Sequence, residues 1–321
     1  MKEKVRLTFS KKYVVQHTRR YDKSHVSVTS HYKSSEGRLF KEGINMQVKI
    51  IDTTLRDGEQ RPGIALGIRE KIEIAKLLSK IGIDQIEAGT PAMGGQEKKS
   101  IEKIVELNLK SKISTWNRMN LKDIKHAVDC WADIIHISVP ASDFQIYFKL
   151  NKDRKWVMNE MQKCIYFARK KGFEVNIGLE DASRADLDFL IEIGKIAARE
   201  GVQMVRYADT VGVLHPQRVY REFPVMVSNI NTYLGIHTHN DFGMAVANSL
   251  GAVAVGVGYI DCTIGGIGER AGNCDYLKFL QGLEGIFNLR PHTDQKIIKQ
   301  LISEITSIIN GKGPNSFIKV V

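Results

Sequence analysis

The chain has 321 residues, of which 43% are hydrophobic and 26% charged, so it is long enough to bury a large core. It contains no apolar run of about 18 residues and no apolar stretch near its start, which argues against a membrane span and a secretory signal. The four cysteines are far apart, so neither a disulfide framework nor a zinc knuckle is indicated, and we expect a cytoplasmic protein with reduced thiols.

Most of the net charge of +11 lies in the first 46 residues, which hold eleven Lys or Arg and four acidic residues. This segment is polar and shows neither a two-residue nor a helical period, so we expect a disordered basic extension. The rest of the chain is close to balanced in charge, which disfavours nucleic-acid binding as its function.

From residue 48 onward, short apolar runs alternate with amphipathic stretches. Each apolar run is followed by a helical pattern, for example residues 69–80, after which Gly82 supplies a stop signal. A last amphipathic stretch covers residues 294–310. Eight apolar runs are predicted to be strands: 48–53, 85–88, 113–116, 134–139, 174–178, 204–208, 233–238 and 259–263.

Strands that alternate with helices at this spacing pair in parallel, and eight such units predict an α/β fold of the (β/α)8 TIM-barrel class. An open doubly wound sheet is the alternative, and it is disfavoured because no Gly-x-Gly-x-x-Gly follows the first strand. The predicted organisation is a basic extension at 1–46, a barrel at 47–290, and a C-terminal helix with a truncated linker at 291–321.

Polar residues follow or end most of the predicted strands. Because a TIM barrel forms its active site at the carboxyl ends of its strands, we expect these side chains to converge. In chain order they are Arg56, Asp57, Glu87, Arg118, Ser138, Glu180, Asp181, Asp209, Thr210, His237, His239 and Asn273.

The His237-Thr238-His239 segment predicts a metal site. Alternate side chains of a strand share one face, so the two histidines can bind one ion. Asp57 would add an anionic ligand, and such a set leaves coordination positions open for a substrate. A His-x-His pair by itself is equally compatible with histidines that only form hydrogen bonds inside a barrel. Mn, Mg, Zn, Co or Fe would suit the mixed nitrogen and oxygen ligands.

Other residues have two interpretations. Arg56 and Glu180 could form a structural ion pair at the mouth of the barrel. Asn273 either contacts the metal or caps the following helix, and Glu87 could be only a buried hydrogen-bonding group. His136 has no partner at a ligand spacing, so it is assigned no role.

A joint pattern is carried by Asp-Thr-Thr-Leu-Arg-Asp-Gly-Glu-Gln at 52–60, His-Thr-His-Asn-Asp at 237–241 and Gly-Ile-Gly-Glu-Arg-Ala-Gly-Asn at 266–273. In these segments the chain resembles the metal-dependent acyl-CoA condensing and lyase barrels, which include isopropylmalate synthase, homocitrate synthase and hydroxymethylglutaryl-CoA lyase. Homocitrate synthases associated with nitrogenase cofactor assembly look most similar in three further segments: 89–94, 180–186 and 206–214.

The resemblance implies a role for each matched residue. Arg56 and Glu180 would be catalytic, and Thr210 would contact a 2-oxo acid. Arg118 is a further candidate for a substrate carboxylate, because a guanidinium fork matches that group. The implied ligands of the divalent metal are Asp57, His237 and His239, with Asn273 as a further or outer ligand.

The implied reaction condenses acetyl-CoA with 2-oxoglutarate and hydrolyses the thioester, giving homocitrate and CoA. Isopropylmalate-type or citramalate-type synthesis, lyase cleavage of a hydroxyacyl-CoA and a non-catalytic subunit are the alternatives. Asn176 stands where many lysine-pathway relatives carry an arginine for the distal carboxylate, so recognition of 2-oxoglutarate is not explained by that position.

Related synthases continue beyond the barrel into a segment that covers the neighbouring subunit's site and supplies a histidine and a tyrosine. No such His-bearing motif follows residues 294–310. We therefore expect a homodimer, or a hetero-oligomer with a separate lid-bearing subunit, that acts on small molecules and not on membranes.

Overall fold

The computed structural model describes residues 15–17, 30–32, 48–291 and 293–311. The chain divides into two units, residues 1–47 and residues 48–321. Within the first unit, β1 (Val15–His17) and β2 (Ser30–Tyr32) pair antiparallel, and the sequence patterns did not predict these strands. The other residues of the extension that was expected to be disordered lie outside the described part of the chain.

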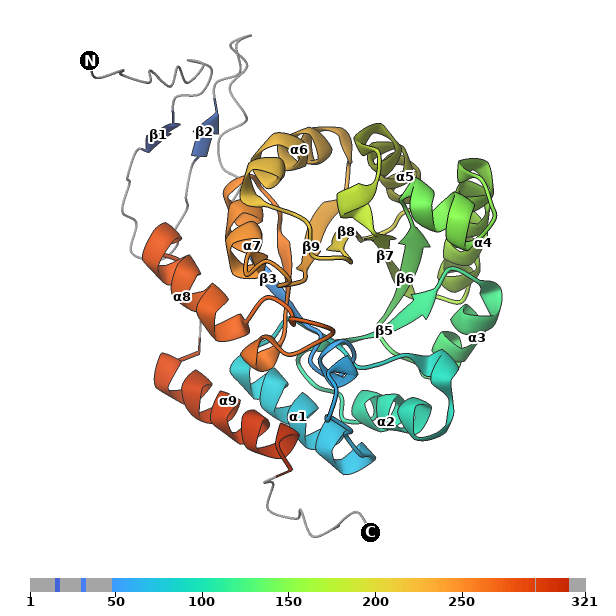
Figure 1. The fold of residues 1–321 in the computed structure, drawn as a ribbon. Helices are drawn as coiled ribbons and strands as arrows, with labels where there is room; N and C mark the ends of the chain where they lie inside the picture. Colours follow the sequence, from blue (N-terminus) through green and yellow to red (C-terminus); the bar gives the residue numbers. More distant parts are fainter. Residues whose placement is uncertain (1–14, 18–29, 33–47, 292, 312–321) are drawn as a thin grey trace, which may run out of the picture. The chain divides into compact units, whose positions relative to one another are not determined.

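Eight parallel strands of the second unit close into a barrel within the described residues (Figure 1). Each strand pairs with the next along the chain, and the last pairs with the first, so that Asp261 lies opposite Ile51. The predicted (β/α)8 class is therefore confirmed. The strands are β3 (Lys49–Asp52), β4 (Gln85–Glu87), β5 (Lys112–Arg118), β6 (Ile134–Pro140), β7 (Glu174–Glu180), β8 (Met204–Asp209), β9 (Tyr233–Thr238) and β10 (Tyr259–Cys262).

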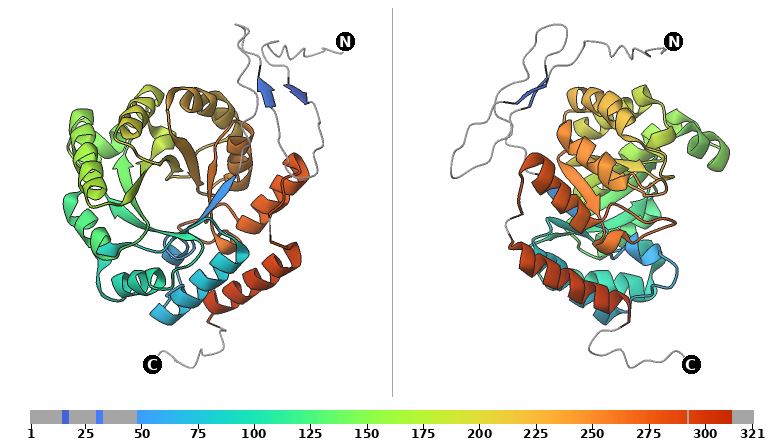
Figure 2. Two further views of the ribbon diagram at one scale, coloured as in Figure 1. Left: turned by 180° about the vertical axis from the view of Figure 1, so that it is seen from behind. Right: turned by 60° about the vertical axis from the view of Figure 1, so that its left-hand side comes forward.

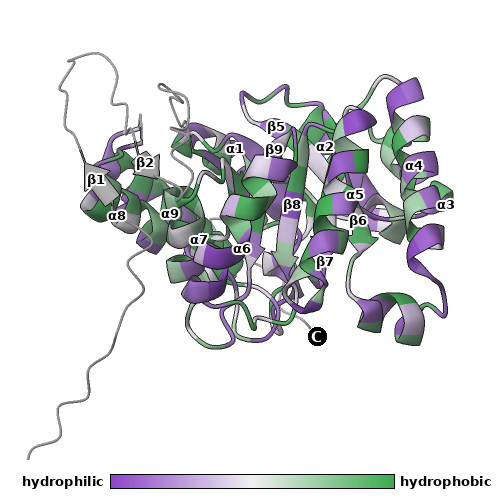
Figure 3. Cartoon of the chain, turned by 90° about the horizontal axis from the view of Figure 1, so that it is seen from above, coloured by the Kyte–Doolittle hydropathy of each residue, from purple (hydrophilic) through white to green (hydrophobic). Residues whose placement is uncertain are grey.

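Helices surround the barrel on its outer side, and they carry both hydrophobic and hydrophilic residues (Figure 2, Figure 3). The last of them, in the predicted C-terminal segment, packs against the first. No helix in the described ranges is both long and apolar enough to cross a bilayer. The helices around the barrel are α1 (Ile68–Ile81), α2 (Gly95–Val105), α3 (Leu121–Asp129), α4 (Arg154–Lys170), α5 (Leu187–Arg199), α6 (Pro216–Asn229), α7 (Ala245–Ala254), α8 (Tyr276–Phe287) and α9 (Gln295–Ile309).

Helix α1 shows how the sequence specifies these elements. Ile74, Leu78 and Ile81 recur at helical spacing and form the buried face of the helix. Gly82 ends the helix in the left-handed region with φ of 94°, and its N–H donates to the carbonyl oxygen of Leu78. The predicted helix at 69–80 and its glycine stop are therefore confirmed.

Short helical segments occupy several connections at the carboxyl ends of the strands. Because these connections begin where the strands end, they hold polar side chains at one end of the barrel. They are η1 (Gly58–Gln60) after β3, η2 (Pro91–Met93) after β4, η3 (Phe144–Lys149) after β6, η4 (Ala182–Arg184) after β7 and η5 (Ile264–Gly266) after β10.

Asp52, at the end of β3, fixes the first of these connections. Its buried carboxylate accepts hydrogen bonds from the Thr54 N–H, at 2.8 Å, and from the Thr54 Oγ1–H, at 3.0 Å. Thr54 Oγ1 accepts in turn from the Ile264 N–H at 2.9 Å, which joins the connections after the first and last barrel strands. Burial raises the pKa of Asp52 to about 7, although its hydrogen bonds with Thr54 act in the opposite direction.

The raised pKa predicts how stability changes with pH. A carboxyl whose pKa is higher in the folded chain binds its proton more tightly there. Its contribution to stability is therefore fully present below the ordinary pKa of 3.8 and is lost as the pH rises through about 7. The side-chain oxygen of Asp52→Asn can still accept from the Thr54 N–H, and its amide can donate to Thr54 Oγ1 in place of the bond that the carboxylate accepts. Because this side chain does not titrate, the variant's free energy of unfolding should fall less than that of the wild type between about pH 5 and pH 8. Urea unfolding of both proteins across this range measures the difference, and parallel pH profiles would contradict the prediction.

Candidate metal centre

Three buried side chains converge at the carboxyl end of the barrel. Asp57 precedes η1, His237 lies in β9, and His239 follows β9. Asp57 Oδ2 lies 3.2 Å from His237 Nε2 and 3.7 Å from His239 Nε2, and the two Nε2 atoms are 3.3 Å apart. The structure therefore brings together the three residues that the sequence pattern predicted as metal ligands.

Two of these separations, 3.2 and 3.3 Å, match a shared metal ion, and the third, 3.7 Å, is slightly wider. Bonds of about 2.1 Å from one ion to nitrogen and oxygen ligands place neighbouring ligand atoms about 3.0 to 3.5 Å apart. The two imidazole planes lie at 78° to each other, so the rings do not stack, and both Nε2 atoms lie within 3.7 Å of Asp57 Oδ2. Two histidines and one carboxylate also leave coordination positions for a substrate. The donor set therefore suits a Lewis-acid metal.

Asn273 lies directly beside this cluster. Its Nδ2 donates to Asp57 Oδ1 at 3.0 Å and to the Ile267 carbonyl oxygen at 2.9 Å, whereas its buried Oδ1 has no hydrogen-bond partner among the described residues. Gly268 makes this approach possible, because a Cβ there would collide with Asn273 Nδ2 and lie 2.7 Å from Asp57 Oδ1. Asp275 caps α8, so the alternative that Asn273 is the cap is wrong.

His237 is oriented by a carboxylate behind it. Its Nδ1 donates to Asp261 Oδ2 on β10 at 3.0 Å, which directs Nε2 toward Asp57. Burial opposes protonation of His237, but the hydrogen bonds with Asp261 and Asp57 outweigh it and raise its pKa to about 9. Burial and the neighbouring His237 lower the pKa of His239 to about 4. When no metal is bound, His237 is therefore the one of the two histidines that is protonated and carries a positive charge.

Arg56 borders the cluster and pairs with two carboxylates. Its Nε donates to Glu87 Oε1 at 2.7 Å and its Nη1 to Asp57 Oδ2 at 3.2 Å, and its guanidinium carbon lies 5.8 Å from the centre of the Trp116 ring. Glu180 is not its partner, so the alternative of a structural Arg56–Glu180 ion pair is wrong. Although burial opposes ionisation, Arg56 and His237 hold the pKa of Asp57 well below its ordinary value.

Glu180 and Thr210 lie at the ends of β7 and β8, on the same end of the barrel as the cluster. The Glu180 side chain is 26% exposed, and its carboxylate accepts hydrogen bonds from Ser138 Oγ, at 3.1 Å, and from Gln145 Nε2, at 3.0 Å. Thr210 Oγ1 accepts from the Asp181 N–H at 2.8 Å. Their catalytic and substrate-binding roles stay predictions.

Arg118 is not brought to the cluster. Its Nε and Nη2 donate to the two carboxylate oxygens of Asp123, at 2.7 and 3.1 Å, and its side chain is 66% exposed. The fork that was expected to receive a substrate carboxylate is therefore already bound by Asp123. The predicted role of Arg118 gains no support from its contacts.

Sequence reasoning named Glu87 as a possible buried hydrogen-bonding group, but it missed the buried polar layer to which Glu87 belongs. Arg206 contacts Glu87, Asp261 and His136, and all four side chains are buried inside the barrel. One signal was present in the sequence, because Arg206 stands in the middle of an otherwise apolar strand. A buried arginine requires buried acceptors, and these would be expected at the inward-facing positions of the other strands.

The sequence pattern of the HMGL-like family matches residues 47–305, which include the whole barrel and the cluster of Asp57, His237 and His239. The chain belongs to the HMGL-like family.

Two relatives and one solved structure describe its place among known proteins. It is 49% identical over 265 residues to the homocitrate synthase subunit alpha of Clostridium pasteurianum, covering 82% of this chain and 98% of that protein. It is 41% identical over 265 residues to 2-isopropylmalate synthase 2 of Caldanaerobacter subterraneus subsp. tengcongensis, covering 83% of this chain and 69% of that protein. A crystal structure of the Bacillus subtilis HMG-CoA lyase has a TM-score of 0.72 at 17% identity, covering 84% of this chain and 95% of that one, which shows the shared fold.

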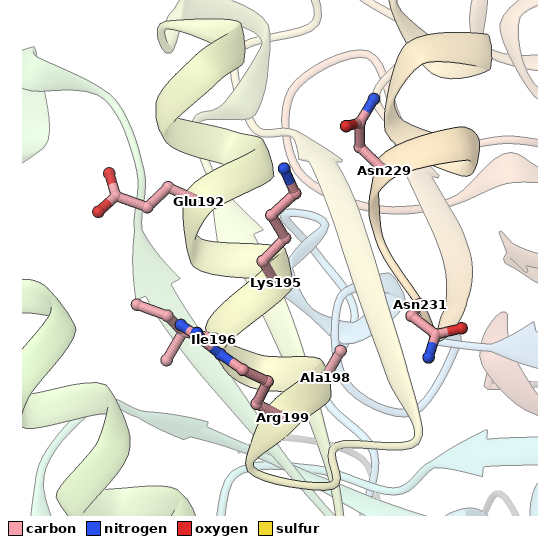
Figure 4. Close-up of a pocket in the computed structure, with 7 residues that line it drawn as sticks. All are labelled: Glu192, Lys195, Ile196, Ala198, Arg199, Asn229 and Asn231. Carbon is pink, nitrogen blue, oxygen red and sulfur yellow. The ribbon is translucent and has the colours of Figure 1, made fainter.

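A surface pocket of about 400 Å³ lies elsewhere on this HMGL-like barrel (Figure 4). It is lined by residues of α5 and by the segment from Asn229 to Asn231. Arg199 and Asn231 precede the starts of β8 and β9, so this pocket is at the amino-terminal end of the strands, opposite the metal cluster. Active sites of TIM barrels form at the other end, so we do not assign the reaction to this pocket.

The cluster predicts a specific loss of metal binding. His237→Ala and His239→Ala each remove one of three ligands, so affinity for Mn or Co should fall more than about tenfold. Asn273→Ala should weaken binding less, because its amide nitrogen faces Asp57. Metal content after dialysis, measured by elemental analysis, checks this, with His126→Ala on α3 as the matched control. Unchanged content in both ligand variants would rule out the site.

Proposed function

We propose that the chain condenses acetyl-CoA with 2-oxoglutarate and hydrolyses the thioester, giving homocitrate and CoA. The observation that carries this proposal is the buried cluster of Asp57, His237 and His239 beside Arg56. It occurs in a chain that is 49% identical to a homocitrate synthase subunit over 98% of that relative. A Lewis-acid site next to a fixed cation suits a reaction in which a carbonyl oxygen gains negative charge.

Asp57, His237 and His239 would hold the metal, with Asn273 in contact with Asp57. When bound, a divalent ion would supply polarisation of the 2-oxo group. Its nitrogen and oxygen donors suit Mn, Mg, Zn, Co or Fe, and the supply of each metal would decide among them as much as affinity does.

Arg56 would stabilise the negative charge that develops on the keto oxygen. Its guanidinium is permanently cationic, and its contacts with Glu87 and Asp57 fix its plane before substrate arrives. A charge that is already oriented needs no reorganisation in the transition state, so it lowers the barrier more than a mobile cation would.

Glu180 would support removal of the methyl proton of acetyl-CoA, directly or through a water molecule. Ser138 and Gln145 donate to its two oxygens, which holds the carboxylate at the partly exposed mouth of the barrel. The deprotonated methyl carbon attacks the keto carbon, and the resulting alkoxide takes up a proton. Water then attacks the thioester carbonyl, and CoA leaves as the thiol.

Thr210 would donate a hydrogen bond to the 2-oxo acid. Its Oγ1 accepts from the Asp181 N–H at 2.8 Å and donates to the Ala208 carbonyl oxygen only over a long 3.5 Å. The hydroxyl would turn its proton from that long contact to a substrate oxygen. This role rests on the resemblance of residues 206–214 and on the position of Thr210 after β8.

A 2-isopropylmalate-type condensation is the second candidate. It is favoured by the 41% identity to a 2-isopropylmalate synthase. It is also favoured by Asn176 of β7, a buried neutral side chain whose Oδ1 has no partner among the described residues and which offers no charge to a distal carboxylate. The two candidates differ in the 2-oxo acid and share the site.

We also propose that a second polypeptide takes part. The name of the Clostridium pasteurianum relative, homocitrate synthase subunit alpha, supports a hetero-oligomer over a homodimer. All four cysteines are buried free thiols, which suits a reducing compartment such as the cytoplasm. Supply of homocitrate to nitrogenase cofactor assembly is the pathway role that the motif resemblance favours.

The proposed reaction predicts acceptor-dependent release of CoA. Thiol release from acetyl-CoA by the purified full chain with Mn or Mg should occur with 2-oxoglutarate and not with 2-oxoisovalerate or pyruvate, and the product should have the mass of homocitrate. A preference for 2-oxoisovalerate would replace the proposal with the second candidate. No release with any acceptor, by protein that has bound metal, would overturn the proposal for this chain acting alone.

Arg56→Lys separates charge from geometry. Lysine keeps the positive charge but cannot bond Glu87 and Asp57 with a planar fork. We expect kcat to fall about 100-fold, and metal affinity to fall less, because the three ligands remain. Steady-state kinetics and metal titration of the same preparations test this, with Arg290→Lys, an exposed arginine paired with Glu284, as the control. Equal losses in kcat and metal affinity would count against a catalytic role for Arg56.

A further inference from the structure

Arg206 is buried inside the barrel and contacts three other buried side chains. Its Nη1 donates to Glu87 Oε2 at 3.0 Å and to Asp261 Oδ2 at 2.6 Å. Its Nη2 donates to His136 Nε2 at 2.7 Å. These partners come from β4, β10 and β6, so one guanidinium joins strands from different sides of the barrel.

Two of these partners also contact residues of the candidate metal centre. Glu87 uses its other oxygen, Oε1, to accept from Arg56 Nε at 2.7 Å, and Asp261 Oδ2 also accepts from His237 Nδ1 at 3.0 Å. Asp57 completes the circuit, because it contacts both Arg56 and His237. We call this circuit the charged ring: Arg56, Glu87, Arg206, Asp261, His237 and Asp57.

The contact of Arg206 with His136 depends on the absence of a side chain at one position of the neighbouring strand β7. Gly178 of β7 lies where a Cβ would stand 2.5 Å from His136 Nε2 and 3.8 Å from Arg206 Nε. A side chain there would push the imidazole away from the guanidinium. Since arginine has no acceptor, His136 Nε2 is the acceptor of this hydrogen bond, and the ring nitrogen Nδ1 carries the proton.

Only an arginine satisfies all of these partners. Its planar fork can donate to two carboxylates and an imidazole at once, whereas a lysine ammonium is a single point on a flexible stem. Glu87 and Asp261 are both buried, so removing their shared cation would leave carboxylates without sufficient compensation. Both would then reorient, and Arg56 and His237 would lose their fixed positions.

We infer that Arg206 is a positioning residue that couples the orientation of Arg56 to that of the metal ligand His237, through Glu87 and Asp261. It lies outside the set of metal ligands and acts on both sides of the site. The effect on turnover rests on the proposed function. The effect on metal affinity and metal spectra rests only on the cluster of Asp57, His237 and His239.

Arg206→Lys in the full chain tests this coupling. Titration with Co²⁺, followed by its visible absorption bands, reports affinity and ligand geometry without requiring turnover. We expect affinity to fall about tenfold or more, the bands to change shape, and kcat to fall more than KM rises. Arg154→Lys is the control, since Arg154 makes a two-bond pair with Asp143 outside the charged ring, and it should leave Co²⁺ affinity unchanged.

A merely structural role predicts a different result. In that case Arg206→Lys would lower the melting temperature while the folded protein keeps wild-type Co²⁺ affinity and bands, and this outcome would overturn the inference. A double-mutant cycle with Glu87→Gln adds a second criterion. Because both residues act through one ring, their combined loss in Co²⁺ affinity should be smaller than the product of the single losses, and simple multiplication of the two losses would contradict the coupling.

Gly178→Ala provides a second variant that leaves the charged ring chemically intact. It should displace His136 and so loosen Arg206, giving a smaller loss of Co²⁺ affinity in the same direction. Wild-type affinity in both Gly178→Ala and Arg206→Lys would overturn the inference. If no acceptor supports thiol release from acetyl-CoA but the Co²⁺ results follow the expected pattern, the proposed function fails for this chain acting alone while the positioning role stands.

Discussion

Burial of Asp57 between Arg56 and His237 is the interaction on which the rest of the site depends. A carboxylate removed from water without compensating charges would be protonated and lost as an anionic ligand. Although burial opposes its ionisation, Arg56 and His237 hold the pKa of Asp57 well below its ordinary value. The protein therefore presents a charged oxygen beside two imidazoles in a region that excludes water. That combination is what gives a bound metal both affinity and strength as a Lewis acid.

Closure of the barrel creates this contact. Asp57 follows the first barrel strand and His237 lies in the seventh, and they meet because β10 pairs with both β3 and β9. The connection after β10 then brings Asn273 onto Asp57. Gly268 permits that approach because no side chain fits between the two groups. The candidate metal centre is therefore a property of the closed sheet, and a change that weakens the pairing of the first and last strands would disturb it.

The sequence by itself determined the fold class and pointed to Asp57, His237 and His239 as candidate metal ligands. Apolar runs alternating with amphipathic stretches specify parallel strands joined by helices, because each local period matches one kind of backbone. The side-chain period of a strand places His237 and His239 on one face, and the position of Asp57 after the first strand places it at the same end of the barrel. The fold class needs only this local geometry, whereas the choice of a metal site over hydrogen-bonded histidines also used the resemblance of residues 52–60, 237–241 and 266–273 to the acyl-CoA condensing and lyase barrels.

Only the tertiary structure decided which charged groups are partners. Arg56 pairs with Glu87 and not with Glu180, and His136, which had no role from its spacing, accepts a hydrogen bond from Arg206. Side chains that point into a barrel meet across its interior, from strands that are neither consecutive nor at any fixed spacing in the sequence. Local periods give the direction in which each side chain points. Which group a side chain meets across the interior depends on the strand register and on the lengths of both side chains. These are brought together only when the barrel closes.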